Sequence, residues 1–209
     1  MTHSKLLVGC LTISVSLCAI NAHAQLPQDS RRAGGIAVVA VPATVTAATF
    51  KKQPVALVTE AGQSYAVVGL LLDLAFGGYP LSLYQGQMLT EQRVIVLQDY
   101  AYKTQHLTIK DQSKVTPDAA QLERYGREAT EQKAAYRSFN PALDQAFPVF
   151  IKPTAGRYSS PFGFKRFFNG EPRAPHTGLD IAAPTGQPAL APAAGQVIQT
   201  GDYFFNGQT

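Results

Sequence analysis

Residues 175–184 read Pro-His-Thr-Gly-Leu-Asp-Ile-Ala-Ala-Pro, and His176 and Asp180 stand four positions apart in this stretch. Two donor atoms on one zinc ion lie within about 4.5 Å of each other, because each sits about 2.0–2.2 Å from the metal. On a straight strand these two positions would be about 13 Å apart, at about 3.3 Å per residue. The chain therefore has to bend if both side chains are to reach one metal. Thr177-Gly178 permits a bend, and the flanking prolines argue against a helix.

The residues on either side make this pattern more specific. Taken alone, a His-x-x-x-Asp spacing is weak, and a turn histidine near an unrelated aspartate is the simpler interpretation. Here Ser-Ser-Pro-Phe-Gly at 159–163 and then Arg166 come before it, and Ala-Pro-Ala-Ala-Gly-Gln-Val at 191–197 comes after it. This ordered series, from about Phe150 to Thr209, resembles the lysostaphin and LytM family of zinc metallopeptidases.

The resemblance implies a β-sheet catalytic domain in which His176 and Asp180 bind Zn²⁺. Members hydrolyse peptide bonds in the stem or cross-link peptides of bacterial peptidoglycan. The family completes its site with a later His-x-His, in which one histidine is the third ligand and the other assists catalysis. No histidine follows His176 in this chain. A catalytic zinc keeps three protein ligands. We therefore expect the catalytic histidine to lie beyond Thr209, and the chain to be a truncated enzyme that is inactive alone.

Other residues are poor substitutes for the third ligand. His106 would have to reach in from the N-terminal half, and Glu171 and Asp202 lack the family's spacing. The missing histidines leave a second interpretation open, a non-catalytic peptidoglycan-binding or hydrolase-activator protein with a degenerate peptidase fold. The presence of both His176 and Asp180 favours the enzyme, because a protein released from zinc chemistry needs neither.

Basic residues near the motif are candidates for substrate binding. Arg157 and Arg166 carry guanidinium groups, which suit the carboxylates of a stem peptide. Solvated surface is the alternative role for both. The partner expected from the resemblance is thus the peptide part of peptidoglycan.

The N-terminal half is rich in β-branched and aromatic residues, with turn residues about every ten positions. Short strands at this spacing predict an antiparallel β-sandwich over residues 25–112. The expected strands are 35–41, 54–58, 65–74, 79–84, 94–97 and 106–109. His106 falls on the polar face of the last one, so we expect it to face solvent. The sandwich shows no catalytic constellation, and its position before the peptidase half suggests intramolecular regulation of that half.

A change of periodicity predicts a helical linker over residues 113–147. Thr116 is the expected N-cap, with Pro117 at the first helical position, and Asn140-Pro141 ends the helix. Leu122, Tyr125, Ala129, Tyr136 and Phe139 would form an apolar stripe. Glu123–Arg127 and Arg127–Glu131 have favourable i,i+4 spacing. The predicted fold is therefore mainly β: an N-terminal antiparallel β-sandwich, a connecting α-helix, and the first half of a LytM-type β-sheet peptidase domain over 148–209.

The first 24 residues are expected to be a signal peptide rather than part of the fold. An apolar run from Leu6 to Ile20 leads to Ala22-His23-Ala24 before Gln25, which is the pattern of a signal-peptidase site. The run has about 15 residues, whereas a membrane-spanning helix needs about 20. We expect cleavage near Ala24-Gln25 and export to the periplasm or cell envelope.

Composition limits the remaining chemistry. Cys10 and Cys18 both fall in the expected signal peptide, so the exported chain would have no cysteine, and any metal would sit on histidine and carboxylates. The 209 residues carry a formal net charge of +4. The sequence contains no run of lysine and arginine of the kind that would predict nucleic-acid binding.

Overall fold

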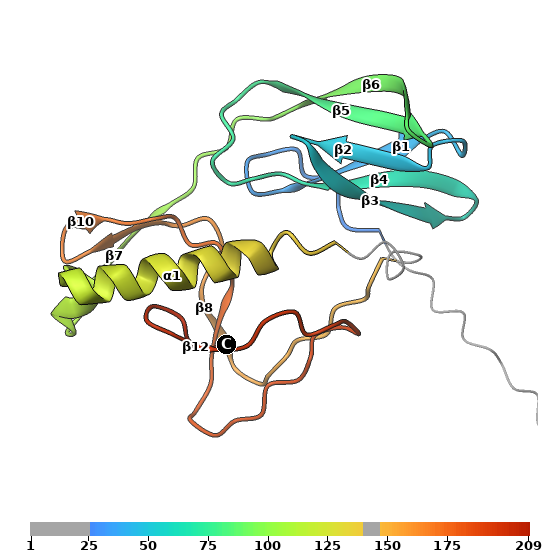
Figure 1. The fold of residues 1–209 in the computed structure, drawn as a ribbon. Coiled ribbons are helices and arrows are strands. Elements are labelled where there is room, and N and C mark those ends of the chain that lie inside the picture. The colour runs from blue at the N-terminus through green and yellow to red at the C-terminus, as the bar shows by residue number, and fades with distance from the viewer. Residues whose placement is uncertain (1–25, 140–146) are drawn as a thin grey trace, which may run out of the picture.

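The computed structural model describes residues 26–139 and 147–209, so the expected signal peptide and the expected helix end at Asn140-Pro141 lie outside the described residues. The architecture is mainly β, which confirms the predicted fold class. Figure 1 shows one group of strands from the N-terminal half, with a long helix and several shorter strands beside it. Within the described ranges, no helix is long and apolar enough to cross a membrane.

Six strands of the N-terminal half form one antiparallel sheet that curls around a shared core. Its order is β1-β4-β3-β2-β5-β6. The strands are β1 (Ile36–Val41), β2 (Ala47–Phe50), β3 (Gln53–Glu60), β4 (Gln63–Gly69), β5 (Gly78–Gln85) and β6 (Met88–Val96). The expected sandwich thus takes the form of a single curled sheet. The sequence missed β2, a four-residue strand that contains two alanines, a residue with weak strand preference.

The core of this sheet follows the two-residue period that strands require. Leu81 and Leu83 on β5 are both fully buried, while Ser82 between them points to the other face. They pack with Ala37 of β1, Ile95 of β6 and other apolar residues in one buried cluster. The alternation in the sequence therefore corresponds to one core on the inner face of the sheet.

A second sheet joins the two halves of the chain. Strand β7 (Thr104–Leu107) pairs in parallel with β9 (Lys165–Phe168), and β9 pairs antiparallel with β10 (Glu171–Pro172). The predicted domain boundary at residue 112 remains a prediction. The β7–β9 pairing joins strands that lie on opposite sides of it in the sequence. His106 is exposed, and its ring stacks on that of Phe167 with 4.9 Å between centroids.

The helix begins later than the sequence predicts. After the short 3-10 helix η1 (Gln112–Lys114), helix α1 spans Ala119–Ala135. The N-cap predicted at Thr116 is wrong: Asp118 is the cap. Its side chain accepts the N–H of Gln121 at 2.8 Å, and the Gln121 side chain accepts the N–H of Asp118 at 2.9 Å. This reciprocal pair satisfies two backbone donors that the start of a helix leaves free.

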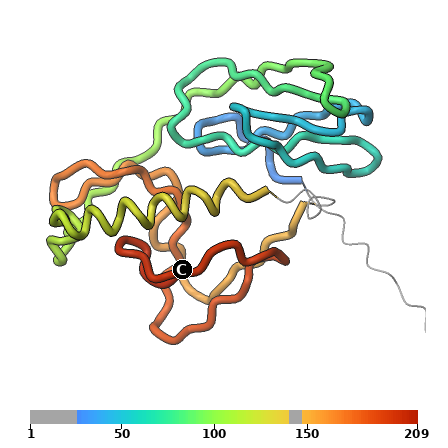
Figure 2. The backbone as a smooth tube through the Cα atoms, viewed as in Figure 1, coloured from blue at the N-terminus to red at the C-terminus, as the bar shows by residue number. Residues whose placement is uncertain are grey.

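Helix α1 contacts the C-terminal hairpin through polar side chains and through Tyr125, whose ring meets that of Phe205 edge-on. None of its residues is buried; in the expected apolar stripe Ala129 is half-buried and the other four residues are exposed, with Tyr136 78% exposed. The hairpin consists of β12 (Asp202–Tyr203) and β13 (Gly207–Gln208). Glu128 accepts the N–H of Phe204 at 2.8 Å, and Arg124 donates to the Asp202 carbonyl at 2.8 Å. Figure 2 shows the red C-terminal segment beside the yellow helix.

The remaining pair of strands carries the motif residues. Strand β8 (Arg157–Ser160) pairs antiparallel with β11 (Asp180–Ala182). Residues 195–200 form no strand, and the β12–β13 hairpin that follows them has strands of two residues each.

Candidate metal site

His176 and Asp180 meet across a bend at the start of β11. Nε2 of His176 lies 3.1 Å from Oδ1 of Asp180, inside the limit for two donor atoms on one zinc ion. The β8–β11 pairing shifts register between Asp180 and Ile181. A shift of this kind turns a side chain away from the face that a regular strand would give it. The bend and the register shift together bring the two side chains to one point.

The His176 ring is held in one orientation. Its Nδ1 lies 2.9 Å from the Pro161 carbonyl and 3.2 Å from Oγ of Ser160, and the side chain is 9% exposed. A carbonyl oxygen only accepts hydrogen bonds, so the contact with Pro161 requires a proton on Nδ1. Nε2 is the ring nitrogen that faces Asp180. A metal-binding histidine is commonly oriented by such a bond from its other nitrogen.

The loop between β8 and β9 also holds the backbone of His176. The N–H of Gly163 donates to the His176 carbonyl at 2.7 Å, and the N–H of His176 donates to the Phe164 carbonyl at 3.0 Å. With the Pro161 contact, three groups of residues 161–164 fix one histidine. The Ser-Ser-Pro-Phe-Gly motif therefore shapes the support of His176.

The two arginines proposed from the sequence have different positions. Arg166 on β9 is 19% exposed, and its Nη2 donates to Oδ2 of Asp180 at 3.1 Å and to Oγ of Ser160 at 2.9 Å. Arg157 on β8 is exposed and is not among the residues that line the pocket at His176. The structure thus brings Arg166 to the site and leaves Arg157 outside it.

Ser160 is the residue whose role the sequence did not reveal. It is 6% exposed, and its Oγ lies within hydrogen-bonding distance of Arg166, of His176 and of Oε1 of Gln105. His176, Asp180, Arg166 and Ser160 therefore form a closed ring of polar contacts. The serine was visible in the motif, but nothing in its spacing indicates that it links an arginine to a histidine.

A pocket of about 520 Å³ opens beside this ring. One side is formed by Arg166 and by residues 175–180, and the other by Tyr136 after α1 and by Phe205, Asn206 and Thr209 of the C-terminal hairpin. The hairpin that α1 holds is therefore a wall of the pocket. A substrate that enters here would meet Nε2 of His176 and the carboxylate of Asp180.

The donor set fits part of a zinc site. A neutral imidazole nitrogen and a carboxylate oxygen are ordinary zinc ligands, and their 3.1 Å separation suits one ion. The residues described contain no group of three histidine, cysteine or acidic side chains placed to hold a metal. Two residues considered as a third ligand have other partners: the His106 ring stacks on Phe167, and Oδ2 of Asp202 lies 3.7 Å from Nη2 of Arg124. The described residues therefore present two candidate zinc ligands, His176 and Asp180, and not a complete set of three.

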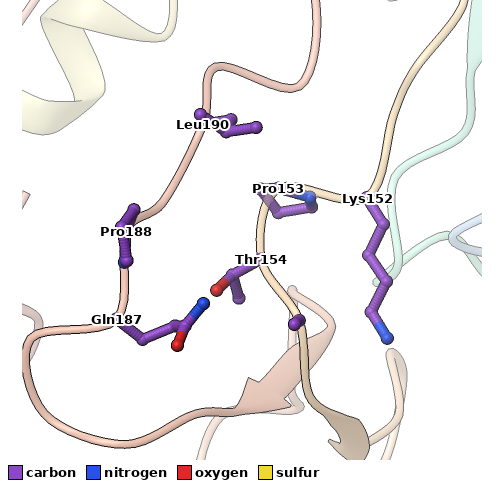
Figure 3. A pocket seen from close by; sticks show the side chains of 7 residues that line it. Lys152, Pro153, Thr154, Gln187, Pro188 and Leu190 are labelled. Carbon is purple, nitrogen blue, oxygen red and sulfur yellow. The ribbon is translucent and has the colours of Figure 1, made fainter.

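A second hollow, of about 380 Å³, lies between residues 152–155 and 187–190. Figure 3 shows the side chains of Thr154 and Gln187 pointing toward each other across it, and Lys152 pointing away. Prolines and Leu190 form much of the lining, which has no histidine or carboxylate. Of these two hollows, the one at His176 has a histidine and a carboxylate in its lining.

A solved structure resembles the chain over most of its length. A crystal structure described as a "putative peptidase M23 from Pseudomonas aeruginosa" matches it with 33% sequence identity and a TM-score of 0.65, covering 86% of this chain and 67% of that one. The chain belongs to the M23 peptidase family. This assignment agrees with the LytM resemblance of residues 150–209. No family model matches the M23 peptidase chain, and no curated protein matches it.

Proposed function

We propose that this M23 peptidase chain is part of a zinc-dependent endopeptidase that hydrolyses peptide bonds in bacterial peptidoglycan. The observation that carries the proposal is the 3.1 Å approach of His176 Nε2 to Asp180 Oδ1, beside an open pocket. The third protein ligand and the assisting histidine would come from a segment outside these 209 residues. In this proposal the chain alone is inactive.

The residues at the site have distinct roles in this proposal. His176 and Asp180 would hold the zinc, which in such enzymes polarises the scissile carbonyl and activates a water molecule. The contact of Nδ1 with the Pro161 carbonyl orients the ring so that Nε2 faces Asp180. Arg166 holds the second carboxylate oxygen of Asp180, so that Oδ1 stays directed at His176. Arg166 would thus act on a ligand rather than on the substrate.

The proposed substrate and location follow from the same resemblance. The substrates would be stem or cross-link peptides of peptidoglycan, met in the periplasm or cell envelope after removal of residues 1–24. The N-terminal sheet would regulate the peptidase half within the same molecule. Support for this comes from β7, which carries the chain of the N-terminal half into the sheet of β9.

The test compares zinc binding and hydrolysis. Calorimetric titration of the purified chain with Zn²⁺ should show binding that His176→Ala abolishes and that His106→Ala, at an exposed histidine, leaves unchanged. Isolated peptidoglycan should release no fragments with this chain. A version extended by its downstream segment should release muropeptides in a zinc-dependent way. Zinc-dependent release by the 209 residues alone would contradict the assignment of ligands.

A second function has one observation in its favour. The described residues provide no three-ligand group, which suits a peptidoglycan-binding or hydrolase-activator protein that has lost catalysis. Such a protein would bind peptidoglycan equally well with His176→Ala and in the presence of a chelator. Weaker peptidoglycan binding after either treatment would favour the zinc enzyme.

A further inference from the structure

Tyr102 connects the N-terminal sheet to the loop that holds His176. It lies between β6 and β7, and its ring lies directly against Gly163, where a Cβ atom would come within 2.0 Å of Tyr102 Cε1. Gly163 also has a φ of +87°, which a side chain would rarely adopt. The backbone at Gly163 is therefore in contact with the tyrosine ring, and no larger residue fits between them.

The other side of Tyr102 is attached to the segment that leads into β1. Its hydroxyl donates to the Ala33 carbonyl at 2.9 Å, and its ring packs edge-on against Tyr100 with 4.7 Å between centroids. The guanidinium of Arg32 lies 4.0 Å from the centre of the Tyr100 ring. Burial raises the pKa of Tyr102, although the nearby Arg32 opposes the change. These contacts therefore hold the Tyr102 ring in the position in which it meets the loop of Gly163.

A second contact joins the same two parts of the molecule. Phe162 packs against Gly34, where an added Cβ would lie 2.6 Å from Phe162 Cε1. Its ring also meets Tyr102 edge-on, with 6.2 Å between centroids. Phe162 and Gly163 are therefore both contacted from the N-terminal side. Phe162 lies between two groups that bond to His176, the Pro161 carbonyl and the Gly163 N–H.

We propose that Tyr102 is a positioning residue for His176, which acts through Gly163 to keep the imidazole ring bonded to the Pro161 carbonyl, with Nε2 aimed at Asp180. The contacts run in one line: the Ala33 carbonyl holds Tyr102, Tyr102 holds Gly163, and the loop of Gly163 holds the histidine by three hydrogen bonds. The expected effect of Tyr102 on Zn²⁺ binding rests on the proposed function, whereas its expected effect on the orientation of the His176 ring does not.

The test reads the histidine ring directly. In the purified chain without residues 1–24, the imidazoles are those of His106 and His176, and ring ¹⁵N chemical shifts at one fixed pH report which nitrogen carries the proton. Tyr102→Leu should move the His176 Nδ1 shift away from its wild-type value, because the ring is no longer held against the Pro161 carbonyl. It should also weaken Zn²⁺ binding by about tenfold, the lower end of the loss when an outer partner of a ligand is removed. Tyr102→Phe keeps an aromatic ring against Gly163, so its His176 shifts and its Zn²⁺ affinity should both stay close to those of the wild type.

Tyr79 supplies a matched control. It is also half-buried, its hydroxyl donates to the Ala75 carbonyl at 2.9 Å, and its ring meets Phe50 edge-on at 6.2 Å. Tyr79→Leu should leave the His176 shifts and the Zn²⁺ affinity unchanged. Equal changes in the two leucine variants would overturn the proposal, because they would reflect general loosening of the sheet. Unchanged His176 shifts in Tyr102→Leu would overturn it as well.

A further variant covers the case in which Tyr102→Leu does not fold. Gly34→Ala pushes against Phe162 from the N-terminal side without changing the tyrosine, and it should shift the His176 ring signals in the same direction. An unchanged His176 spectrum in folded Gly34→Ala would count against the coupling. If the wild-type chain binds no Zn²⁺, the proposed function fails, while the ¹⁵N measurement still decides the role of Tyr102.

Discussion

The carboxylate of Asp180 is shared between two partners: its Oδ2 lies 3.1 Å from Nη2 of Arg166, and its Oδ1 lies 3.1 Å from Nε2 of His176. One oxygen is thus held by a permanent cation, and the other faces the histidine. The arrangement explains why an arginine in this position belongs to the support of the site.

Arg166 is expected to matter for metal binding. Arg166→Leu should weaken Zn²⁺ binding by about tenfold, because the carboxylate of Asp180 loses the partner that orients it. Arg166→Lys should bind Zn²⁺ with an affinity between those of the wild type and Arg166→Leu, since a lysine keeps the positive charge but not the planar guanidinium group. Isothermal titration with Zn²⁺ measures both, and Arg157→Leu on the exposed end of β8 is the control. Equal affinities of wild type and Arg166→Leu would show that Arg166 does not position Asp180.

Ser160 is expected to contribute to stability. Ser160→Ala removes the oxygen that accepts from Arg166, and it should lower the free energy of unfolding by about 1–3 kcal/mol, the usual cost of a buried polar group without its partner. Urea unfolding followed by circular dichroism measures the change. The neighbouring Ser159 is exposed, so Ser159→Ala should stay within about 0.5 kcal/mol of the wild type. A similar small effect for both serines would contradict the role given to Ser160.

The core of the curled sheet gives a third prediction. Leu81 is 0% exposed, whereas Leu122 on α1 is 53% exposed. Leu81→Ala should cost about 2–5 kcal/mol, since it removes a buried side chain and leaves a cavity. Leu122→Ala should change the unfolding free energy by less than about 0.5 kcal/mol. A large loss for Leu122→Ala would mean that the exposed stripe of the helix is covered by a partner in solution.

The contact between α1 and the C-terminal hairpin should depend on pH. Burial alone would raise the pKa of Glu128, but the Phe204 N–H and the Arg124 guanidinium outweigh it, and the pKa lies below its usual 4.5. A lowered pKa means that the contact is fully present above about pH 4.5 and is lost as the pH falls through the lower, folded-state value. The amide NMR shift of Phe204 should follow this titration.

Two carboxamide variants make the pH measurement specific. Glu128→Gln should remove the acid-induced shift of the Phe204 amide, because the side chain no longer titrates. Glu123→Gln should keep it, since Glu123 bonds to Arg127 at 2.9 Å and not to the hairpin. A shift that persists in Glu128→Gln would assign the titration to another carboxylate.

Local pattern was enough to predict most strands, whereas the approach of His176 to Asp180 was expected from the resemblance of the motifs around them to a known family. The alternation at Leu81–Leu83 gives the core face, and the required bend lies between His176 and Asp180. The pairing of β7 with β9 could not be predicted, because partners some 60 positions apart in sequence leave no periodic signal in either strand.

The support around the site was also beyond local pattern. Ser160 and Tyr102 act through contacts with Arg166 and Gly163, which depend on how separate loops meet. The helix start was misplaced by two residues, because Thr116 and Asp118 are both good capping residues and only the reciprocal bond with Gln121 distinguishes them.

The parallel strand pair β7–β9 determines where the gene can be divided. A recombinant fragment that starts at residue 148 would leave β9 with a free edge, whose unpaired N–H and C=O groups invite self-association. A fragment that ends at residue 112 would carry β7 without its partner. Any exchange of the peptidase half between proteins, in the laboratory or by recombination, therefore has to move residues 104–107 together with it.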